Sequence, residues 1–527
     1  CFMRKTVKKL TAVGLTVTSV LGLVACGSSK GTTSQGTSEN KEVTKPDTFT
    51  VMCDGTVVTE TNGAEAFYKQ LNEATGLDIK WTRPDHASYY DAVANAFNSD
   101  DTMPDVVLLS SDYYALYASN GFLWNMTDAW EHSETKNSGR LISTADNVLS
   151  ALMVNGEDGT KAMYGLSLYR GNGCCTYVKK AWLDKAGIDA SKVKDVQMDF
   201  NTYYGYLKQM AQTMGHYVIS SPGFIHPEAP NTNYLPEFYQ KAQYTFYKDT
   251  SGKYVDGFAQ QEMKEALQRI QTAVNDGVID KESVNNSTAN ARDKFYSTDP
   301  STETGVFTYW AGTWANTLKT NLANKGLDDE LIAIKPIKEL GAYTERIAPC
   351  WCITSAAKNP EGIFKYFIDK MLDGGDVQML WTHGAKGTHW DDKAETVTVE
   401  KKEDQPKTYT EGQFHYLPGI EKPDQWQTKN HIDPILSIAN FTNGYVGESL
   451  IPEVARENGE FFAENSQVAV PLPMTSELSN NIGDINTART YVIAQVALGY
   501  MTVDEGMDYY NKTVGSLSNA VLKSLNK

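Results

Sequence analysis

Apolar and polar positions alternate between strand-like and helix-like periods over the first folded stretch of the chain. Residues 47–55 (DTFTVMCDG) alternate with a period of two, which predicts a β-strand. Residues 62–76 have Asn62 as a cap, an apolar face at helical spacing and a closing Gly76, which predicts a helix. Residues 77–84 (LDIKWTRP) alternate again. A strand, a helix and a strand in this order predict a βαβ unit in a parallel sheet.

A continuous apolar run at 104–110 (PDVVLLS) follows a second predicted helix at 89–97. Such a run is typical of a strand buried on both faces of a parallel sheet. In open sheets of this kind, ligands bind beyond the carboxyl ends of the strands. Asp54, Asp112 and Tyr113 follow such ends and are therefore candidate ligand contacts. Helix capping is the simpler interpretation of Asp112, and Asp54 has the same ambiguity.

Helical periodicity returns later in the chain. Further helices are predicted from an apolar face, from an Asn-Pro start signal and from the terminal pattern; they cover 263–276, 359–374 and the region from about 487 onward, whose last segment starts at Thr502 or Asp504. The strongly charged stretch 391–410 is expected to form an exposed hairpin.

The N-terminal region has the anatomy of a secretory signal. Four basic residues between positions 4 and 9 precede an apolar run, 10–25, that is shorter than the roughly 20 residues of a permanent membrane span. The run ends at Cys26, and Leu23-Val24-Ala25-Cys26 resembles the lipobox of bacterial lipoproteins. The resemblance implies removal of a signal peptide at 1–25 and a diacylglycerol on the Cys26 sulfur. An ordinary signal peptide with a chance cysteine is the alternative.

The residues that follow Cys26 are almost entirely Gly, Ser, Thr, Asn and Lys. We expect 26–46 to form a flexible tether, because such a segment cannot bury enough apolar surface to fold.

Composition narrows the classes of ligand. The formal charge of −17 becomes −21 without the four basic residues of the signal, which argues against nucleic acid. It also disfavours a strongly anionic glycan, unless a local basic patch overrides it. Aromatic residues make up 11% of the chain, with 29 Tyr and 10 Trp, which fits either sugar stacking or a large aromatic core.

Beyond the N-terminal region the chain has five cysteines, an odd number whose spacing fits neither a disulfide framework nor a zinc site. We expect buried thiols in strands; the residues are Cys53, Cys174, Cys175, Cys350 and Cys352.

Several longer stretches resemble one family in their order and spacing. They are MPDVVLLSSDYYALYASNGFLWNMTD (103–128), MYGLSLYRGNGCCTYVKKAWLDKAGI (163–188), DGFAQQEMKEALQRIQTAVNDGVID (256–280) and GVFTYWAGTWANTL (305–318). Together they resemble the extracellular solute-binding proteins of the sugar-binding group (family 1, large lipoprotein branch), which serve ABC importers. The resemblance implies an α/β fold of the periplasmic-binding-protein-like type II. Such a fold has two α/β lobes, a hinge of crossing strands and a ligand cleft between the lobes.

The same resemblance implies the domain organisation. The first lobe is expected at 47–165 plus 347–376, and the second at 166–346 plus 377–527. Hinges are expected at 166–169, 347–352 and 376–381.

A sugar presents an apolar face of C–H groups and a rim of hydroxyls, so its site needs flat aromatic rings and polar side chains. Trp314 matches the family position after a strand and is the leading candidate for stacking. Trp310, one turn earlier, is more often a core residue, and Trp351 suits core and cleft equally. Further candidate contacts are Tyr169, Arg170, Glu237, His389 and Trp390.

No nucleophile-elbow, zinc-protease, phosphate-loop or dinucleotide motif occurs in the sequence. Carboxylate pairs of a glycosidase cannot be chosen among 65 acidic residues. Residues 247–256 loosely resemble a calcium loop, with Asp249, Ser251 and Asp256 as oxygen donors, but a turn between a strand and a helix is the favoured interpretation. We therefore expect no catalytic residue, no metal and no cofactor.

The resulting prediction is a lipid-anchored receptor on the extracytoplasmic face of a bacterial membrane. It captures an oligosaccharide and delivers it to the permease subunits of an ABC importer, and it acts as a monomer without nucleic acid. An oligopeptide receptor of an ABC importer is one alternative. A surface carbohydrate-active enzyme is the alternative from another class.

Overall fold

The computed structural model describes residues 43–55, 63–85, 88–109, 111–139, 141, 149–157, 159–167, 172–225, 232–327, 330–347, 349–397, 407–417, 453–470, 472–473 and 475–527. The predicted signal peptide, Cys26 and most of the tether lie outside these residues. Within the described part of the chain, no helix is long and apolar enough to cross a membrane.

The first lobe contains a four-stranded sheet in the order β12-β3-β1-β2. Strand β1 (Thr48–Met52) pairs in parallel with β2 (Asp78–Thr82) and with β3 (Val106–Leu109), which confirms the predicted βαβ unit. Strand β12 (Cys350–Ile353) joins antiparallel to β3. All four side chains of β3 are buried, as its continuous apolar pattern predicted.

Helix α1 (Ala64–Thr75) crosses between β1 and β2, with Ala64, Phe67 and Leu71 buried. It ends as predicted at Gly76, which has the left-handed backbone (φ 63°) that favours glycine. Its N-cap is Gly63, so the predicted cap Asn62 is wrong.

The remaining elements of the first lobe are short. They are α2 (Tyr89–Ala96), α3 (Ser111–Ser119), α4 (Thr127–Glu131), α5 (Glu134–Asn137), β4 (Met153–Asn155), β5 (Lys161–Met163), α14 (Pro360–Ile363), the π-helical turn η5 (Phe364–Ile368), the 3-10 turn η6 (Asp369–Leu372) and α15 (Asp376–His383). The predicted Asn359 cap is present, because its side chain accepts a hydrogen bond from the Gly362 N–H.

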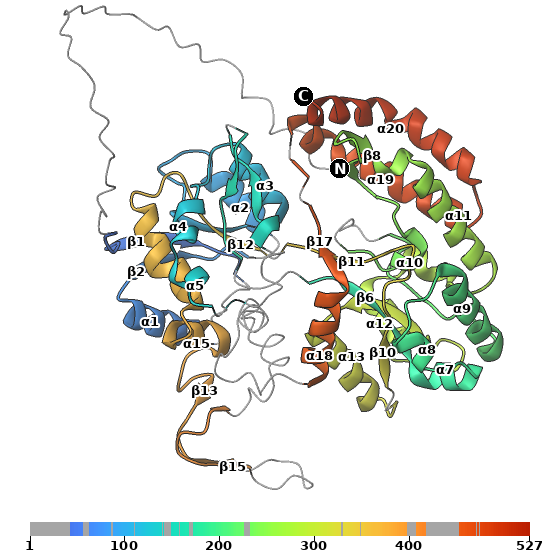
Figure 1. The fold of residues 1–527 in the computed structure, drawn as a ribbon, viewed down its shortest axis with the longest axis horizontal. Helices are drawn as coiled ribbons and strands as arrows, with labels where there is room; N and C mark the ends of the chain where they lie inside the picture. Colours follow the sequence, from blue (N-terminus) through green and yellow to red (C-terminus); the bar gives the residue numbers. More distant parts are fainter. Residues whose placement is uncertain are drawn as a thin grey trace, which may run out of the picture. The chain divides into compact units, whose positions relative to one another are not determined.

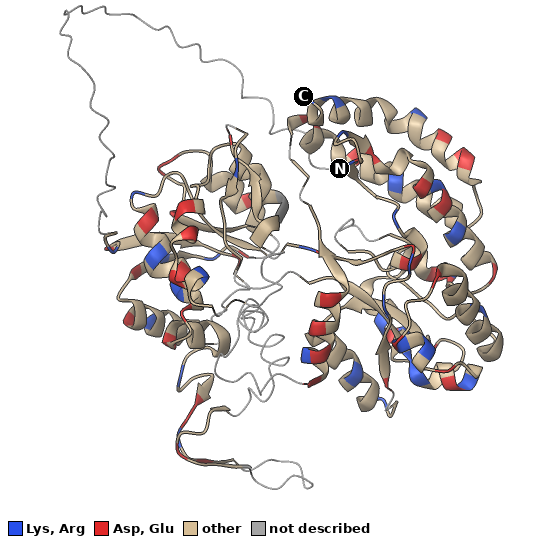
Figure 2. Ribbon diagram, viewed as in Figure 1, with Lys and Arg blue, Asp and Glu red and all other residues tan. Residues whose placement is uncertain are grey.

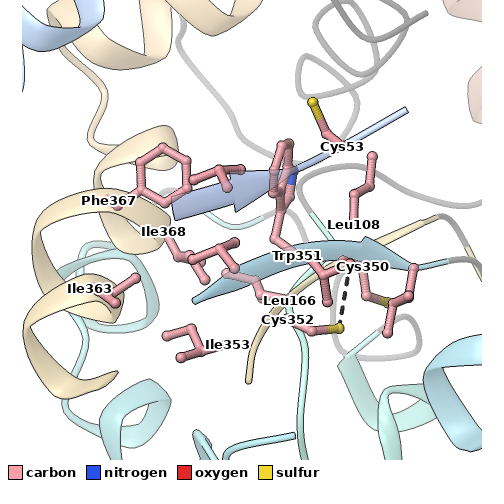
Figure 3. Close-up of a cluster of buried hydrophobic side chains, with 14 of the residues drawn as sticks. Cys53, Leu108, Leu166, Cys350, Trp351, Cys352, Ile353, Ile363, Phe367 and Ile368 are labelled. Carbon is pink, nitrogen blue, oxygen red and sulfur yellow. Dashed lines mark hydrogen bonds between the residues drawn. The ribbon is translucent and has the colours of Figure 1, made fainter. Parts of the chain in front are cut away.

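One aromatic cluster forms the centre of the first core, which we define as the buried apolar side chains between 49 and 166 and between 347 and 385. Trp351 is fully buried on β12, 5.6 Å from the Trp381 ring and 6.0 Å from Phe367. Figure 3 shows its indole on the opposite side of the strand from the Cys352 thiol. Because Val377, Leu380 and Trp381 pack in this core, residues 376–381 form a core helix, and the predicted hinge there is wrong. The prediction also gave residues from 377 onward to the second lobe, whereas these side chains belong to the first.

The second lobe is built on the three-stranded sheet β10-β6-β9. Strand β6 (Cys174–Lys179) lies in the middle, antiparallel to both β9 (Val306–Trp310) and β10 (Leu331–Ala333). The other elements of this lobe are α7 (Lys180–Ala186), α8 (Ser191–Lys194), α9 (Phe200–Met214), α10 (Pro236–Tyr239), β7 (Phe246–Lys248), β8 (Tyr254–Asp256), η3 (Gly257–Ala259), α11 (Gln261–Asn275), η4 (Lys281–Asn285), α12 (Thr288–Phe295), α13 (Thr313–Asn324), β11 (Tyr343–Glu345), α18 (Glu453–Glu464), β17 (Ser466–Val468), α19 (Ser476–Ala497) and α20 (Val503–Leu525).

Three long helices, α11, α19 and α20, pack side by side in this lobe (Figure 1). The six apolar side chains that predicted α11 are all buried. Thr502 is the N-cap of α20 and forms a capping box with Glu505, which confirms the first of the two predicted starts. Helix α19 starts at Ser476, earlier than the predicted 487.

The stretch that resembled a calcium loop forms the β7–β8 hairpin. Its turn connects two strands, whereas a turn between a strand and a helix was predicted. The Asp249 carboxylate accepts hydrogen bonds from the Ser251 and Lys253 backbone N–H groups of its own turn. Asp256 is instead buried and bonded to Arg489, so the predicted donors do not gather around one point. Among the described residues, no group of three or more His, Cys, Asp or Glu side chains is placed to hold a metal ion.

Two small antiparallel pairs, β13 (Trp390–Asp391) with β16 (His415–Tyr416) and β14 (Glu395–Val397) with β15 (Lys407–Tyr409), follow the first core. The second pair confirms the hairpin predicted for 391–410, in so far as its residues are described. The five predicted buried thiols are all buried, although Cys53 lies just beyond β1.

The chain segments at the other two predicted hinges lie beside each other. Leu166 forms an isolated antiparallel bridge with Trp351, and the Arg346 N–H donates to the Asn172 carbonyl at 3.1 Å. Strand β11, which precedes Arg346, pairs in parallel with β17. Leu166 and Asn172 therefore each lie beside a described residue of the segment between β11 and β12 or of β12 itself.

Candidate functional site

One edge of the second-lobe sheet gathers polar and aromatic groups around a backbone turn. Strands β6 and β9 are antiparallel with Cys174 opposite Trp310, so β6 begins where β9 ends. Gly312 then turns the chain into α13 with φ 68° and ψ −120°, a backbone conformation that glycine adopts far more readily than other residues. The Asn172 side chain donates to the Ala311 carbonyl at 3.0 Å, and the Gly312 N–H donates to the Asn458 side chain at 2.7 Å. These bonds hold the turn in place.

Two tryptophans flank that turn, and an arginine accompanies each of them. Trp314, at the start of α13, is half-buried and meets Tyr309 edge-on with ring centroids 5.0 Å apart. The Arg292 guanidinium lies 5.3 Å from the Trp314 ring and donates to the Tyr309 hydroxyl at 3.0 Å. On the other side of the turn, the Arg346 guanidinium lies 4.4 Å from the half-buried Trp310 ring. We call these four side chains the Arg–Trp edge.

Burial raises the pKa of Tyr309, the side chain that receives the Arg292 hydrogen bond. The Tyr309 hydroxyl therefore stays neutral at physiological pH and does not cancel the arginine charge. The Arg–Trp edge is thus cationic and aromatic at once, a combination that can bind the apolar face and the oxygens of a sugar.

The edge of the first-lobe sheet carries a second aromatic group. Tyr113, near the start of α3, stacks on Tyr90 with ring centroids 3.8 Å apart and planes at 5°. Tyr117 continues the stack at 6.4 Å from Tyr113. Asp54 follows β1 and is partly exposed. Asp112 lies in the first turn of α3, and its side chain is outside the described part of the chain, so the choice between capping and ligand contact is not tested.

Two of the predicted contacts lie in the interior of this structure. Trp351 is fully buried in the first core, which favours the core interpretation of this residue. Glu237 on α10 is 1% exposed; the Thr176 hydroxyl donates to its carboxylate at 2.8 Å, and the Tyr343 hydroxyl lies 3.2 Å from it. Burial raises the pKa of Glu237 to about 7. Glu237 therefore ties β6 to β11 inside the second lobe and does not face solvent.

His389 and Trp390 stabilise the turn that contains them. The His389 Nδ1 accepts from the Ala385 N–H at 2.7 Å, and the side chain is 1% exposed. The Trp390 indole donates to the Gly384 carbonyl at 2.9 Å, and its ring stacks on Phe414. Tyr169 and Arg170 lie outside the described residues.

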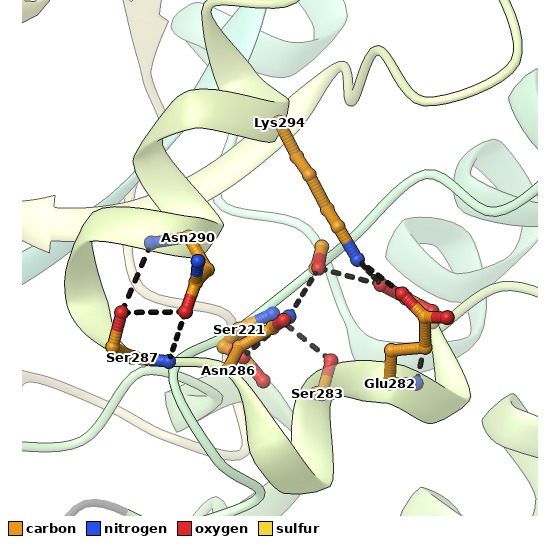
Figure 4. A network of polar contacts seen from close by, with 9 residues as sticks. Ser221, Glu282, Ser283, Asn286, Ser287, Asn290 and Lys294 are labelled. Carbon is orange, nitrogen blue, oxygen red and sulfur yellow. Dashed lines mark hydrogen bonds and ion pairs between the residues drawn. The ribbon is translucent and has the colours of Figure 1, made fainter.

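An open hollow of about 380 Å³ lies elsewhere on the second lobe, around α12 and η4; it is lined by Glu282, Asn286, Asn290, Asp293, Lys294, Ser297 and Thr302. Lys294 Nζ lies 2.7 Å from the Asp280 carboxylate and 2.9 Å from that of Glu282 (Figure 4). The two carboxylates therefore neutralise Lys294, and none of the described residues that line the hollow is aromatic. We place the candidate site at the sheet edges instead.

Arg292, Arg346 and Asn458 were not among the predicted site residues. Arg346 adjoins the predicted hinge at 347–352, and this position is the only signal that could have drawn attention to it. Nothing in the local pattern around Arg292 or Asn458 marks either residue, because each reaches the edge only through the tertiary fold.

Comparison with solved structures assigns the architecture. An alginate-binding protein, AlgQ2, superposes with a TM-score of 0.55 at 16% identity, covering 93% of this chain and 100% of its own. The chain has the two-lobe fold of the solute-binding proteins. An HMO-binding solute-binding protein associated with an ABC transporter of Bifidobacterium longum infantis superposes with a TM-score of 0.59 at 14% identity, covering 91% of this chain and 98% of its own.

A third solute-binding protein, the N-glycan transport protein NgtS of Streptococcus pneumoniae, superposes with a TM-score of 0.56 at 17% identity. It covers 91% of this chain and 98% of its own. No family model and no curated protein sequence matches this chain. The likeness is therefore one of fold, and it agrees with the expected periplasmic-binding-protein-like type II architecture.

Proposed function

We propose that this protein is a sugar-binding member of the extracellular solute-binding proteins that captures an oligosaccharide for an ABC importer. The Arg–Trp edge carries this proposal, since it places Trp310 and Trp314 at the carboxyl end of β9, where open α/β sheets bind ligands. The stacked tyrosines at the edge of the first-lobe sheet supply a second set of flat rings. The solved structures that share the fold support the ligand class, because three of them bind or transport alginate, HMO and N-glycans.

In this function the protein does no chemistry. Binding of the sugar favours a closed arrangement of the two lobes, and the permease subunits recognise that arrangement. The sequence from Arg4 to Cys26 supports an extracytoplasmic position, with a lipid on Cys26 and the tether of 26–46 setting the distance from the membrane. The protein acts as a monomer.

The test of ligand class is a thermal-shift titration of the purified protein with neutral oligosaccharides, acidic oligosaccharides and short peptides. A ligand that binds only the folded state raises the melting temperature. We expect a shift with oligosaccharides, and binding at least about tenfold weaker in Trp314→Ala, because an aromatic platform contributes about 1 kcal/mol or more. Tyr500→Ala is the matched control, since Tyr500 is 72% exposed in the turn between α19 and α20.

Each other outcome of the titration excludes the proposal. A shift with peptides alone would identify a peptide receptor, and disappearance of the added glycan would identify an enzyme.

A second experiment addresses the anchor: intact-mass analysis of membrane-extracted protein should find a lipidated N-terminal Cys26. Cys26→Ala should appear unlipidated, whereas a wild-type protein without lipid would remove the anchor from the proposal.

A further inference from the structure

Within the part of the chain that the structure describes, neither arginine of the Arg–Trp edge has an acidic partner. No carboxylate within the described residues forms an ion pair with Arg292 or Arg346; Arg292 donates one side-chain hydrogen bond to Tyr309, and Arg346 has its cation–π contact. The same chain pairs Arg456 with Glu460 and Arg489 with Asp256. The described contacts of the Arg292 and Arg346 guanidinium groups are therefore aromatic rings and one hydroxyl rather than carboxylates.

The contacts of these two arginines leave most of their N–H donors available to a ligand. A cation–π contact uses no N–H···O hydrogen bond, so the donors of each guanidinium stay available, apart from the one that Arg292 gives to Tyr309. The planar fork matches a carboxylate, to which it can donate two parallel hydrogen bonds. The Trp310 and Trp314 rings therefore pre-position two forks, and Tyr309 takes one donor of Arg292. Helix α13 begins at Thr313, between the two tryptophans in the sequence, and its N-terminus adds a partial positive charge.

The overall negative charge does not counter this local field. Exposed charges are largely screened beyond about 8 Å at physiological ionic strength, so the nearest groups decide what the edge attracts. Figure 2 shows acidic and basic residues interspersed along the helices of the second lobe rather than gathered by sign. The charge of −17 is thus distributed over the chain and leaves room for a cationic edge.

We infer that the ligand of this site is an acidic oligosaccharide, whose carboxylates are bound by Arg292 and Arg346 beside Trp314 and Trp310. The inference rests on the proposed function and adds to it the class of sugar. It reverses the expectation from net charge, which disfavoured a strongly anionic glycan. A uronic-acid or sialic-acid oligosaccharide has the required chemistry, with a carboxylate on a ring that also offers C–H faces.

The test compares glycans that differ only in charge. Oligouronates and sialylated oligosaccharides are titrated by calorimetry into the purified protein, each beside its carboxyl-reduced counterpart. We expect the acidic member to bind at least about tenfold more tightly, because a charge-assisted hydrogen bond contributes about 1.5 to 3 kcal/mol. Raising the salt concentration should weaken the acidic member and leave the neutral one nearly unchanged.

Variants assign the effect to the two arginines. Arg292→Gln and Arg346→Gln should each lose most of the preference for the acidic glycan. Arg292→Lys and Arg346→Lys keep the charge, remove the fork and should lose part of it, which guards against a Gln variant that fails to fold. Arg456→Gln removes the same charge from a paired site on α18 and should keep the full preference.

The outcomes separate this inference from the proposed function. Equal binding of acidic and neutral members would overturn the inference and leave an oligosaccharide receptor. A preference for acidic glycans that survives in all four variants would also overturn it, since the carboxylate would then be bound elsewhere. Binding of no glycan, in a protein that is folded by circular dichroism, would overturn the inference and the proposed function together.

Discussion

The second lobe uses arginine in two opposite ways. Around Asp256, the Arg489 side chain is fully buried and its guanidinium lies 2.8 Å from the carboxylate. The Tyr510 and Ser518 hydroxyls donate to the same carboxylate at 2.7 and 2.6 Å, so β8, α19 and α20 are joined at one point. At the Arg–Trp edge, by contrast, half-buried Arg292 and exposed Arg346 contact rings and have no carboxylate in the described part of the chain.

The difference shows how one side chain serves stability in one place and recognition in another. A buried guanidinium must be paired, because an isolated buried charge costs several kcal/mol. A guanidinium at a surface keeps its hydration and can exchange water for a ligand carboxylate at little cost to the fold. The buried pair of Arg489 and Asp256 is therefore structural, whereas the donors at the Arg–Trp edge are those that we propose for recognition.

The largest expected effect comes from breaking the buried pair. Arg489→Met leaves the Asp256 carboxylate buried without its cation, and we expect the free energy of unfolding to fall by about 3 to 5 kcal/mol. Urea denaturation followed by circular dichroism measures this change. Arg456→Met on α18 is the matched control and should change the free energy by less than about 0.5 kcal/mol, because its pair is exposed. A small effect of Arg489→Met would mean that hydroxyl donors alone satisfy Asp256.

A second prediction concerns Glu237, a buried carboxylate whose described partners are hydroxyl groups rather than a cation. Burial raises its pKa from an ordinary value of 4.5 to about 7. The folded state therefore holds a proton that the unfolded state releases, and the stabilisation by neutral Glu237 is complete below pH 4.5 and is lost as the pH rises toward 7. The loss amounts to about 3 kcal/mol, since each unit of pKa is about 1.4 kcal/mol.

Glu237→Gln isolates this effect, because glutamine fills the same space without a charge. The free energy of unfolding of the variant, relative to wild type, should rise by about 3 kcal/mol between pH 4.5 and 7. Urea denaturation at several pH values measures it. Glu460→Gln, exposed on α18, should show no such rise. A difference between Glu237→Gln and wild type that does not vary with pH would contradict the burial of an ionisable group at this position.

The sequence predicted those parts of the molecule that depend on local pattern. The βαβ unit, α11 and the Thr502 cap follow from periodicity and capping signals that involve neighbouring residues. Residues 376–381 were misassigned to a hinge because a resemblance to other chains placed the boundary there, whereas Val377, Leu380 and Trp381 pack in the first core. Periodicity over so few residues does not say which core a short helix joins.

The sequence predicted only some residues of the candidate site, because local pattern does not show which distant residues meet in the fold. Trp310 and Trp314 stand in a recognisable strand-turn-helix motif, and the structure places both at the edge of the sheet. Their arginines come from α12 and from the end of β11, which reach the edge through the tertiary fold. Trp351 had neighbours that suited core and cleft alike, and only the burial of every side chain on β12 distinguishes the two.

The smallest expected effect completes the comparison of the two arginine environments. Arg292→Gln and Arg346→Gln should each change the free energy of unfolding by less than about 0.5 kcal/mol, since no ion pair within the described residues is lost and both side chains reach water. The measurement is the same urea denaturation used for Arg489→Met, without any glycan present. A loss of 2 kcal/mol or more in either variant would show that its cation–π contact is a structural element, and the Arg–Trp edge would then resemble the clasp around Asp256. Unchanged stability together with weakened binding of acidic glycans would separate the two roles of arginine within one lobe.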